Sequence, residues 1–291
     1  MLNEYYELNN GVKIPKLGLG TWLIDNEKVV DVVKSAIEVG YRHIDTAQAY
    51  ENEEGVGKAI RESGVAREKI FVTSKVAAEA KTYEEAYQSI TESLNKMGLD
   101  YLDLMIIHSP EPWAEFRGEK RYFEENKEVW RALETAYKEG KVKAIGVSNF
   151  LKDDLENILS SCEIKPMVNQ ILTHVSNTKK ELISFCKEHD ILVEAYSPIA
   201  HGAALENEEL QKMAQKYHVS VPQLCIRYVL ELGLVALPKA STKEHISDNA
   251  KVDFEISEDD MNVLKNMDTI ENYGSDDFFP VFSGKNQKDN K

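Results

Sequence analysis

Cysteine and positive charge are both scarce in this sequence. The three cysteines, Cys162, Cys186 and Cys225, are far apart and form no Cys-x-x-Cys pair, so we expect free thiols in a reducing cytoplasm. No metal-ligand spacing occurs among them and the seven histidines, which argues against a metal site. The 35 basic and 50 acidic residues leave a net charge of −15. This negative charge argues against nucleic acid and anionic membranes as partners.

The sequence also lacks a long apolar run, a signal-like start and a linker. No run approaches the ~18 residues that cross a bilayer, and the acidic segment 1–7 does not resemble a signal peptide. There is no Pro/Gly/Ser-rich break in composition. We therefore expect residues 1–291 to form a single domain, with 284–291 as a polar, disordered tail.

What the sequence does contain is a regular alternation of short apolar runs and amphipathic segments. Strands separated by helices must pair in parallel, because a parallel connection needs a long crossover. Eight such units favour an α/β fold of the (β/α)8 TIM-barrel type over an open sheet. The predicted strands are Lys16–Gly20, Arg42–Asp45, Ile70–Val76, Leu102–His108, Val142–Val147, Met167–Gln170, Ile191–Tyr196 and Leu234–Leu237.

Helical periodicity fills the intervals between these strands. An Asn-Gly turn within Glu7–Val12 adds an N-terminal β-hairpin, which could close the bottom of the barrel, and there are extra helices beyond the eight units. The predicted helices are Glu27–Glu38, Glu51–Glu62, Tyr83–Met97, Glu124–Lys138, Lys152–Ser160, Lys179–His189, Glu208–Tyr217, Pro222–Glu231, Lys243–Asn249 and Ser257–Asp268.

Four polar residues lie at or just beyond the ends of predicted strands. Asp45, Lys75 and His108 each end or nearly end a strand, and Tyr50 follows Asp45 by five residues. The carboxyl ends of parallel barrel strands meet at one rim, where barrel enzymes carry their chemistry. A phenol, with an ordinary pKa of about 10, needs a nearby cation to act near neutrality. Lys75 could be that cation, so the set suits protonation of a carbonyl that receives an external hydride.

Six motifs in order extend this observation to most of the chain. They are Leu17–Trp22, Gly40–Ala47 followed by Tyr50, Lys75 with Ile107-His108, Ile145–Phe150, Val168–Gln170 and Ala195–Pro198. With these motifs the chain resembles the aldo-keto reductases over nearly its whole length. The usual dinucleotide-binding fingerprint is missing, since Ile60 stands where Gly55-Val56-Gly57 would need a third glycine.

The resemblance implies a monomeric TIM barrel that binds NADPH across the C-terminal rim and reduces small dicarbonyls, sugar-derived keto acids or other aldehydes. Tyr50 would be the general acid, Lys75 would lower its pKa, Asp45 would support Lys75, and His108 would orient the substrate. Substrate contacts would also include Trp22 and Trp113. The implied cofactor contacts are Gly20, Thr21, Asp45, Ser148, Asn149, Gln170, Tyr196, Ser197, Ile199, Lys239, Ala240, Ser241, His245 and Asn249.

Two parts of the sequence depart from the family pattern. Near the adenosine phosphate, Ala240 and His245 stand where a Ser and an Arg are common, which predicts a weaker grip on the 2′-phosphate and some tolerance of NADH. Around the substrate, Ala77 and Ser109 replace two common tryptophans, which predicts a wider, more polar mouth unless Trp113 or Phe116 refills it. The apolar run Phe278–Phe282 should dock somewhere on the protein.

Other readings of these residues remain open. The chain could be a nicotinamide-binding scaffold without turnover, or a different barrel enzyme that uses Lys75 as a Schiff base. Asp45 argues against the second reading, because a nearby carboxylate keeps an amine charged. We expect His43 to be structural, His174 to lie at the surface, and the run Glu51, Glu53 and Glu54 to form a solvated helix start.

Overall fold

The computed structural model describes residues 1–270, 273 and 279–282. In this part of the chain eight parallel strands form one sheet in the order β10-β9-β8-β7-β6-β5-β4-β3, and the parallel bridges Leu17–Ala236 and Gly20–Lys239 join its two edges. The sheet therefore closes into the predicted barrel. The strands are β3 (Leu19–Gly20), β4 (His43–Asp45), β5 (Phe71–Val76), β6 (Leu104–Ile107), β7 (Ile145–Ser148), β8 (Val168–Leu172), β9 (Leu192–Tyr196) and β10 (Val235–Leu237).

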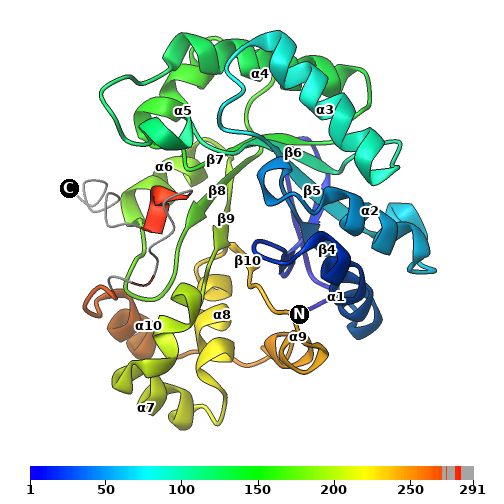
Figure 1. Ribbon diagram of the computed structural model, residues 1–291. Helices are drawn as coiled ribbons and strands as arrows, with labels where there is room; N and C mark the ends of the chain where they lie inside the picture. Colours follow the sequence, from blue (N-terminus) through cyan, green and yellow to red (C-terminus); the bar gives the residue numbers. More distant parts are fainter. Residues whose placement is uncertain (271–272, 274–278, 283–291) are drawn as a thin grey trace.

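The helices surround these strands in chain order, so that α9 lies beside α1 where the ring closes (Figure 1). Short 3-10 helices, η1 (Gln48–Tyr50) among them, lie in the connections. The α-helices are α1 (Asn26–Val39), α2 (Glu53–Glu62), α3 (Tyr83–Met97), α4 (Phe123–Lys138), α5 (Lys152–Leu159), α6 (Lys180–Glu188), α7 (Glu208–Lys216), α8 (Val221–Glu231), α9 (Lys243–Asn249) and α10 (Glu258–Lys265).

Local sequence signals explain where several helices begin and end. α3 starts at Thr82, whose hydroxyl accepts from the Glu85 backbone while the Glu85 carboxylate accepts from the Thr82 N–H. It ends at Gly98, which has a φ of 62°, a conformation that favours glycine. Ser220 and Gln223 form the same reciprocal cap at α8. These caps place the helix boundaries within a few residues of the predicted ones.

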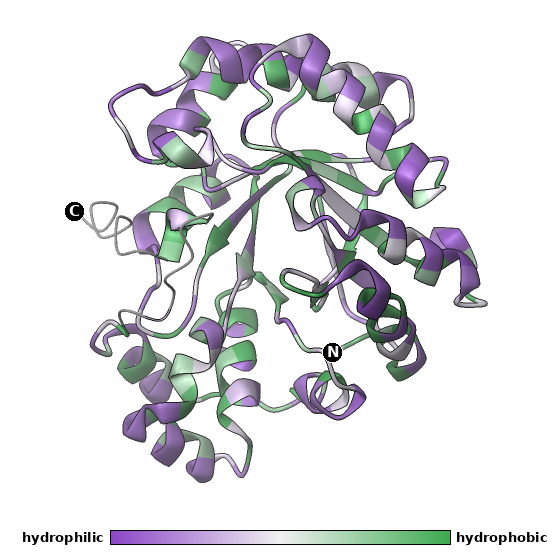
Figure 2. Cartoon of the chain, viewed as in Figure 1, coloured by the Kyte–Doolittle hydropathy of each residue, from purple (hydrophilic) through white to green (hydrophobic). Residues whose placement is uncertain are grey.

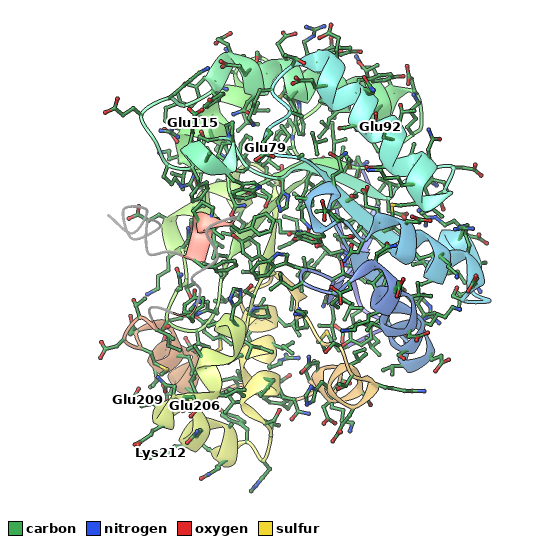
Figure 3. The ribbon with its side chains drawn as sticks, viewed as in Figure 1. Glu79, Glu92, Glu115, Glu206, Glu209 and Lys212 are labelled. Atoms are coloured by element: carbon green, nitrogen blue, oxygen red, sulfur yellow. The ribbon has the colours of Figure 1, made fainter. Side chains whose placement is uncertain are left out.

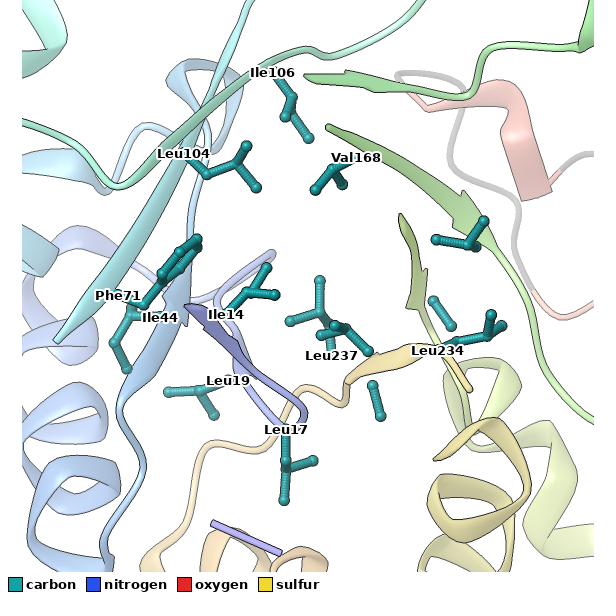
Figure 4. Packing of buried hydrophobic residues seen from close by; sticks show 14 of the residues in the cluster. Ile14, Leu17, Leu19, Ile44, Phe71, Leu104, Ile106, Val168, Leu234 and Leu237 are labelled. Atoms are coloured by element: carbon teal, nitrogen blue, oxygen red, sulfur yellow. The ribbon is translucent and has the colours of Figure 1, made fainter. Parts of the chain in front are cut away.

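Hydrophobic residues concentrate on the strands and the inner helix faces, and hydrophilic residues on the outer helix faces (Figure 2). The barrel interior is packed with side chains such as Leu104, Ile106 and Val168 (Figure 4), none of which is exposed. Charged side chains such as Glu92 on α3 and Lys212 on α7 project outward (Figure 3). This arrangement is the packed core of a (β/α)8 barrel, with helices as its outer layer.

The N-terminal hairpin closes the bottom of the barrel. β1 (Tyr5–Glu7) pairs antiparallel with β2 (Lys13–Pro15), and its turn buries Leu8. The Asn9 amide donates to the Pro166 and Asp190 carbonyls, and the Asn10 amide donates to the Lys143 carbonyl. These carbonyls precede β8, β9 and β7, so the turn covers the ends opposite the rim expected to carry the chemistry.

Gly55 and Gly57 serve helix packing, not dinucleotide binding. A Cβ atom at Gly55 would lie 2.1 Å from the Asn26 carbonyl oxygen, and one at Gly57 would lie 2.1 Å from that of Met97. The two glycines therefore let α2 approach α1 and the end of α3. The solvated helix start predicted nearby is wrong for Glu53, which is 3% exposed and accepts a hydrogen bond from Ser74.

Some predictions changed in extent, and some fall outside the described residues. β3 covers only the last two residues of the predicted Lys16–Gly20, because Leu17 alone among the preceding residues forms a bridge, to Ala236 of β10. The tail 284–291 and Phe278 lie outside the described part. Within that part no helix is long and apolar enough to span a membrane, no group of three or more His, Cys, Asp or Glu could hold a metal ion, and the three cysteines are free.

Candidate active site

Side-chain alternation along the strands brings the predicted catalytic set together. Asp45 ends β4, Lys75 lies on β5, and His108 follows β6 directly. Tyr50 ends η1, where Gln48 fixes the turn by accepting from the Ala77 N–H and donating to Ser89 and Ser93. All four side chains converge on one rim of the barrel.

Lys75 is the hub of this set. Its Nζ lies 2.5 Å from Asp45 Oδ1, 2.8 Å from the Thr46 carbonyl oxygen and 3.3 Å from the Tyr50 hydroxyl. Burial would lower the pKa of Lys75, but Asp45 and Tyr50 outweigh it, so the net pKa is raised and the amine stays charged. A charged amine is a poor Schiff-base nucleophile.

Tyr50 and His108 carry the groups that could meet a carbonyl oxygen. Burial raises the pKa of Tyr50, and Lys75 opposes that rise without cancelling it, so the net direction is opposite to the predicted lowering. The phenol is therefore protonated at neutral pH. The rings of Tyr50 and His108 lie 5.6 Å apart, edge to face. Burial and, next, the Lys75 charge hold the pKa of His108 well below its usual value, so its imidazole is neutral with one ring N–H.

A second network lies beside the catalytic set, on β7, β8 and β9. Ser148 donates to the Gln170 carbonyl, and Asn149 donates to the Ser148 hydroxyl and the His108 carbonyl. The Tyr196 hydroxyl donates to Asn149 Oδ1 over 2.6 Å. Asn149 has a φ of 60°, unusual for a non-glycine residue, and such strain concentrates at functional sites.

Two adjoining cavities at this rim form one groove. The inner cavity lies over the predicted catalytic set, and the outer one leads away from it; counted up to open solvent, they hold about 610 and 1500 Å³. Trp22, Ser197 and Lys239 line both. All the predicted cofactor contacts line this groove: Gly20, Thr21, Asp45, Ser148, Asn149, Gln170, Tyr196, Ser197 and Lys239 line the inner cavity, and Ile199, Ala240, Ser241, His245 and Asn249 the outer one.

The chemistry of the groove fits an extended dinucleotide. Amide and hydroxyl groups lie at the barrel end beside the flat ring of Tyr196, as a carboxamide-bearing ring would require. Lys239, Ser241 and His245 supply a cation, a hydroxyl and an imidazole at the far end, which suit a phosphate. A Cβ atom at Gly20 would lie 3.3 Å from the Leu237 carbonyl oxygen, so the groove wall comes close to the backbone there.

Comparison with known proteins places this geometry in a family. The aldo/keto reductase family model matches residues 16–269. The chain belongs to the aldo/keto reductase family. A glyoxal reductase of Bacillus subtilis is 45% identical over 275 residues, which cover 94% of this chain and 96% of the relative. A methylglyoxal reductase of Salmonella typhimurium, DkgA, is 38% identical over 92% of this chain and 95% of its own.

Solved structures agree with this assignment. An aldo-keto reductase of Bombyx mori, solved in complex with NADP, is 32% identical and superimposes with a TM-score of 0.85. The match covers 94% of this chain and 96% of that one. The predicted family and TIM-barrel fold are therefore confirmed.

Compared with the family pattern, the mouth of this groove is rebuilt with different aromatic residues. Phe279 lies 5.0 Å from Trp113, 5.4 Å from Trp22 and 5.5 Å from His108, measured between ring centroids, and Phe282 stacks on Trp22 at 5.3 Å. The mouth is therefore lined by aromatic rings, in place of the more polar mouth expected if the space were left unfilled. The alternative of refilling by Trp113 is correct, but most of the new wall comes from the C-terminal segment 279–282, whose docking site the sequence left open.

The sequence analysis did not predict the contacts of three residues around the aldo/keto reductase site. Arg117 donates to the Asn149 carbonyl over 3.0 Å and so supports the strained turn. His174, expected at the surface, is 1% exposed and lies 2.5 Å from the Tyr273 hydroxyl. Glu194, on β9, is fully buried beside Gln170. In the sequence Glu194 immediately precedes the Ala195–Pro198 motif, and this position could have indicated that Glu194 lies at the site.

Proposed function

We propose that this protein reduces small aldehydes and ketones to alcohols with NADPH, and that Tyr50 is the proton donor. The observation that carries the proposal is the contact of the Tyr50 hydroxyl with a charged, carboxylate-held Lys75, at the base of a groove that suits a dinucleotide. Membership of the aldo/keto reductase family and the NADP complex of a family member support it.

The chain's own groups divide the work. When bound, the cofactor supplies the hydride. His108, neutral and beside the phenol, donates its ring N–H to the carbonyl oxygen and so aims that oxygen at Tyr50. Tyr50 gives its proton to the oxygen as negative charge develops there. Lys75 stabilises the phenolate that remains, and Asp45 keeps Lys75 charged and in place.

Small dicarbonyl compounds are the substrate class that the site favours. The inner cavity is walled by Trp22, Trp113 and Phe279, whose rings pack against one another and leave little room for a large aldehyde above Tyr50. Two of the relatives are named glyoxal and methylglyoxal reductases. We infer that compounds of this size are reduced in preference to bulky aromatic aldehydes.

Tyr50→Phe tests the proposal. We expect turnover with glyoxal or methylglyoxal to fall by about 10²–10⁴-fold, because the proton donor is removed, while NADPH binding stays intact. The measurements are initial rates of NADPH oxidation and direct titration of NADPH by tryptophan fluorescence. Tyr87→Phe is a matched control, since its hydroxyl contacts Glu139 on the outer surface. Substantial turnover in Tyr50→Phe would overturn the assignment of the acid.

The same measurements distinguish the scaffold alternative. A scaffold would bind NADPH but would oxidise it with none of glyoxal, methylglyoxal, a diketo sugar acid and benzaldehyde. We favour the enzyme because Asp45, Lys75, Tyr50 and His108 are linked in series by close contacts at the base of the groove.

A further inference from the structure

The buried carboxyl group of Glu194 has no part in the proton transfer described above. Glu194 lies on β9, opposite Gln170 of β8 in the parallel register, and both side chains point into the barrel. It is 0% exposed. A buried carboxyl group is costly to keep unless it makes a specific contact, so its contacts should explain its presence.

Those contacts converge on the Gln170 amide. Gln170 Nε2 donates to Asp45 Oδ2 over 2.8 Å and to Glu194 Oε1 over 3.3 Å. An amide nitrogen carries two hydrogens, so both are used by the two carboxyl groups beneath it. The carbonyl oxygen Oε1 is then the end of the amide left for a ligand in the groove that Gln170 lines.

The hydrogen bonds to Asp45 and Glu194 together hold the Gln170 amide in one orientation, which a single hydrogen bond would not do. With Asp45 alone, the amide could keep one N–H on the carboxylate while its plane rotates and Oε1 swings toward the place of Glu194. With Glu194 present, that rotation breaks the second hydrogen bond. Glu194 therefore fixes both the end and the plane of the Gln170 amide.

The surroundings of Glu194 allow it to do this without adding a second charge beside Asp45. Burial first, then the charge of Asp45, raises the pKa of Glu194 to about 8, so the group is protonated at neutral pH. Its Oε2 lies 3.6 Å from His43 Nε2. His43 Nδ1 lies 3.3 Å from the Pro15 carbonyl, which makes Nδ1 the donor and Nε2 an acceptor, and Thr73 Oγ1 also lies 3.4 Å from that Nε2.

We propose that Glu194 is a positioning residue that locks the Gln170 amide so that its oxygen accepts from the carboxamide amino group of the nicotinamide. This inference rests on the proposed function, because it assumes that the nicotinamide end of the cofactor lies over Gln170. It assigns Glu194 an effect on cofactor recognition and not on proton transfer.

Glu194→Met and Glu194→Gln form the test pair. Methionine and glutamine are similar in shape, but only glutamine has a carbonyl oxygen that can accept a hydrogen bond from Gln170. We expect Glu194→Gln to keep the wild-type Kd for NADPH at pH 7 and Glu194→Met to raise it about tenfold, the worth of one hydrogen bond. In turnover the loss should fall mainly on KM for NADPH, with kcat changed less.

Two further ligands separate positioning from damage to the fold. Adenosine 2′,5′-bisphosphate lacks the nicotinamide, so its Kd should be the same in both variants. The acetylpyridine analogue of NADPH lacks the carboxamide N–H, so the tenfold difference between the variants should disappear. Glu53→Met and Glu53→Gln are the control pair, since Glu53 is also a buried acid with a raised pKa but contacts Ser74 outside the barrel.

The outcomes are distinct. Equal NADPH affinities for Glu194→Met and Glu194→Gln would overturn the inference, as would a difference that persists with the acetylpyridine analogue or with adenosine bisphosphate. If Glu194→Met does not fold, loss of NADPH affinity in Glu194→Gln at pH 7 would itself overturn it. Failure of the wild type to bind NADPH would instead refute the proposed function.

Discussion

At the barrel end of the groove the polar side chains are buried and hold one another, whereas Lys239, Ser241 and His245 at the far end are exposed. Asp45, Lys75 and Gln170 are each at most 3% exposed and are joined by hydrogen bonds of 2.5 and 2.8 Å. Lys239 and His245 are exposed, and within the described residues their side chains make no hydrogen bond.

This difference matches what each end would do under the proposed function. Proton and hydride transfer demand reacting groups placed within a fraction of an ångström, which only an interlocked, buried network maintains. The far end needs only to hold a phosphate, and a flexible cation in water can do that. Both departures from the family pattern in the expected cofactor contacts lie at this end: His245 is exposed, whereas Ala240 is 7% exposed and packs against the core.

Lys75→Met should disrupt the hydrogen-bonded network at the barrel end of the groove, and it should have the largest effect on stability and turnover. It leaves the Asp45 carboxylate buried without its cation, which we expect to lower the free energy of unfolding by about 3–5 kcal/mol and to abolish turnover. Lys239→Met, at the exposed end, should change stability by less than about 0.5 kcal/mol while weakening NADPH binding. Urea unfolding of both variants measures this, and equal losses would refute the contrast.

Glu194→Gln tests the buried end of the groove through the pH dependence of protein stability. Burial raises the pKa of Glu194 from 4.5 to about 8, so between these values the folded protein keeps a proton that the unfolded chain releases. The stability of the wild type should therefore fall, relative to Glu194→Gln, by up to about 1.4 kcal/mol for each pH unit of rise. The difference should level off above pH 8.

Chemical unfolding of the wild type and Glu194→Gln at pH 5, 6, 7 and 8 measures this difference. The interval from pH 7 to 8 decides the test, because His43, whose burial lowers its pKa to about 4, is neutral there in the folded protein and does not add to the pH dependence. A stability difference that stays constant with pH would mean that Glu194 is already ionised in the folded protein.

His245→Arg should strengthen NADPH binding at the exposed end of the groove, and its expected effect is the smallest. A guanidinium pairs with a phosphate through two hydrogen bonds, which an imidazole cannot do. We expect the Kd for NADPH to fall about tenfold, equivalent to about 1.4 kcal/mol, and that for NADH to stay unchanged. An equal gain for both cofactors would show that position 245 does not face the 2′-phosphate.

The barrel and the convergence of the four polar side chains on one rim could be predicted from sequence because both follow from local patterns. Apolar runs with a polar last residue gave the strands, and the short distance from Asp45 to Tyr50 tied the phenol to the same rim. The roles of Phe279 and Glu194 could not be predicted in this way. Phe279 meets Trp22 and Trp113 only through the fold, and a glutamate within an apolar strand gives no sign of its partner until the β8–β9 register is known.

The seam between β3 and β10 also has a consequence for how the molecule is made. Gly18 and Gly20 donate to the carbonyls of Ala236 and Pro238, more than 210 positions later in the chain. During synthesis the first strand must therefore wait, one edge open, until almost the whole polypeptide has left the ribosome, on the order of tens of seconds. Contacts so distant in sequence form slowly, so we expect seam closure to be the last step of folding and the open edge to be the point where a nascent chain is most exposed to aggregation.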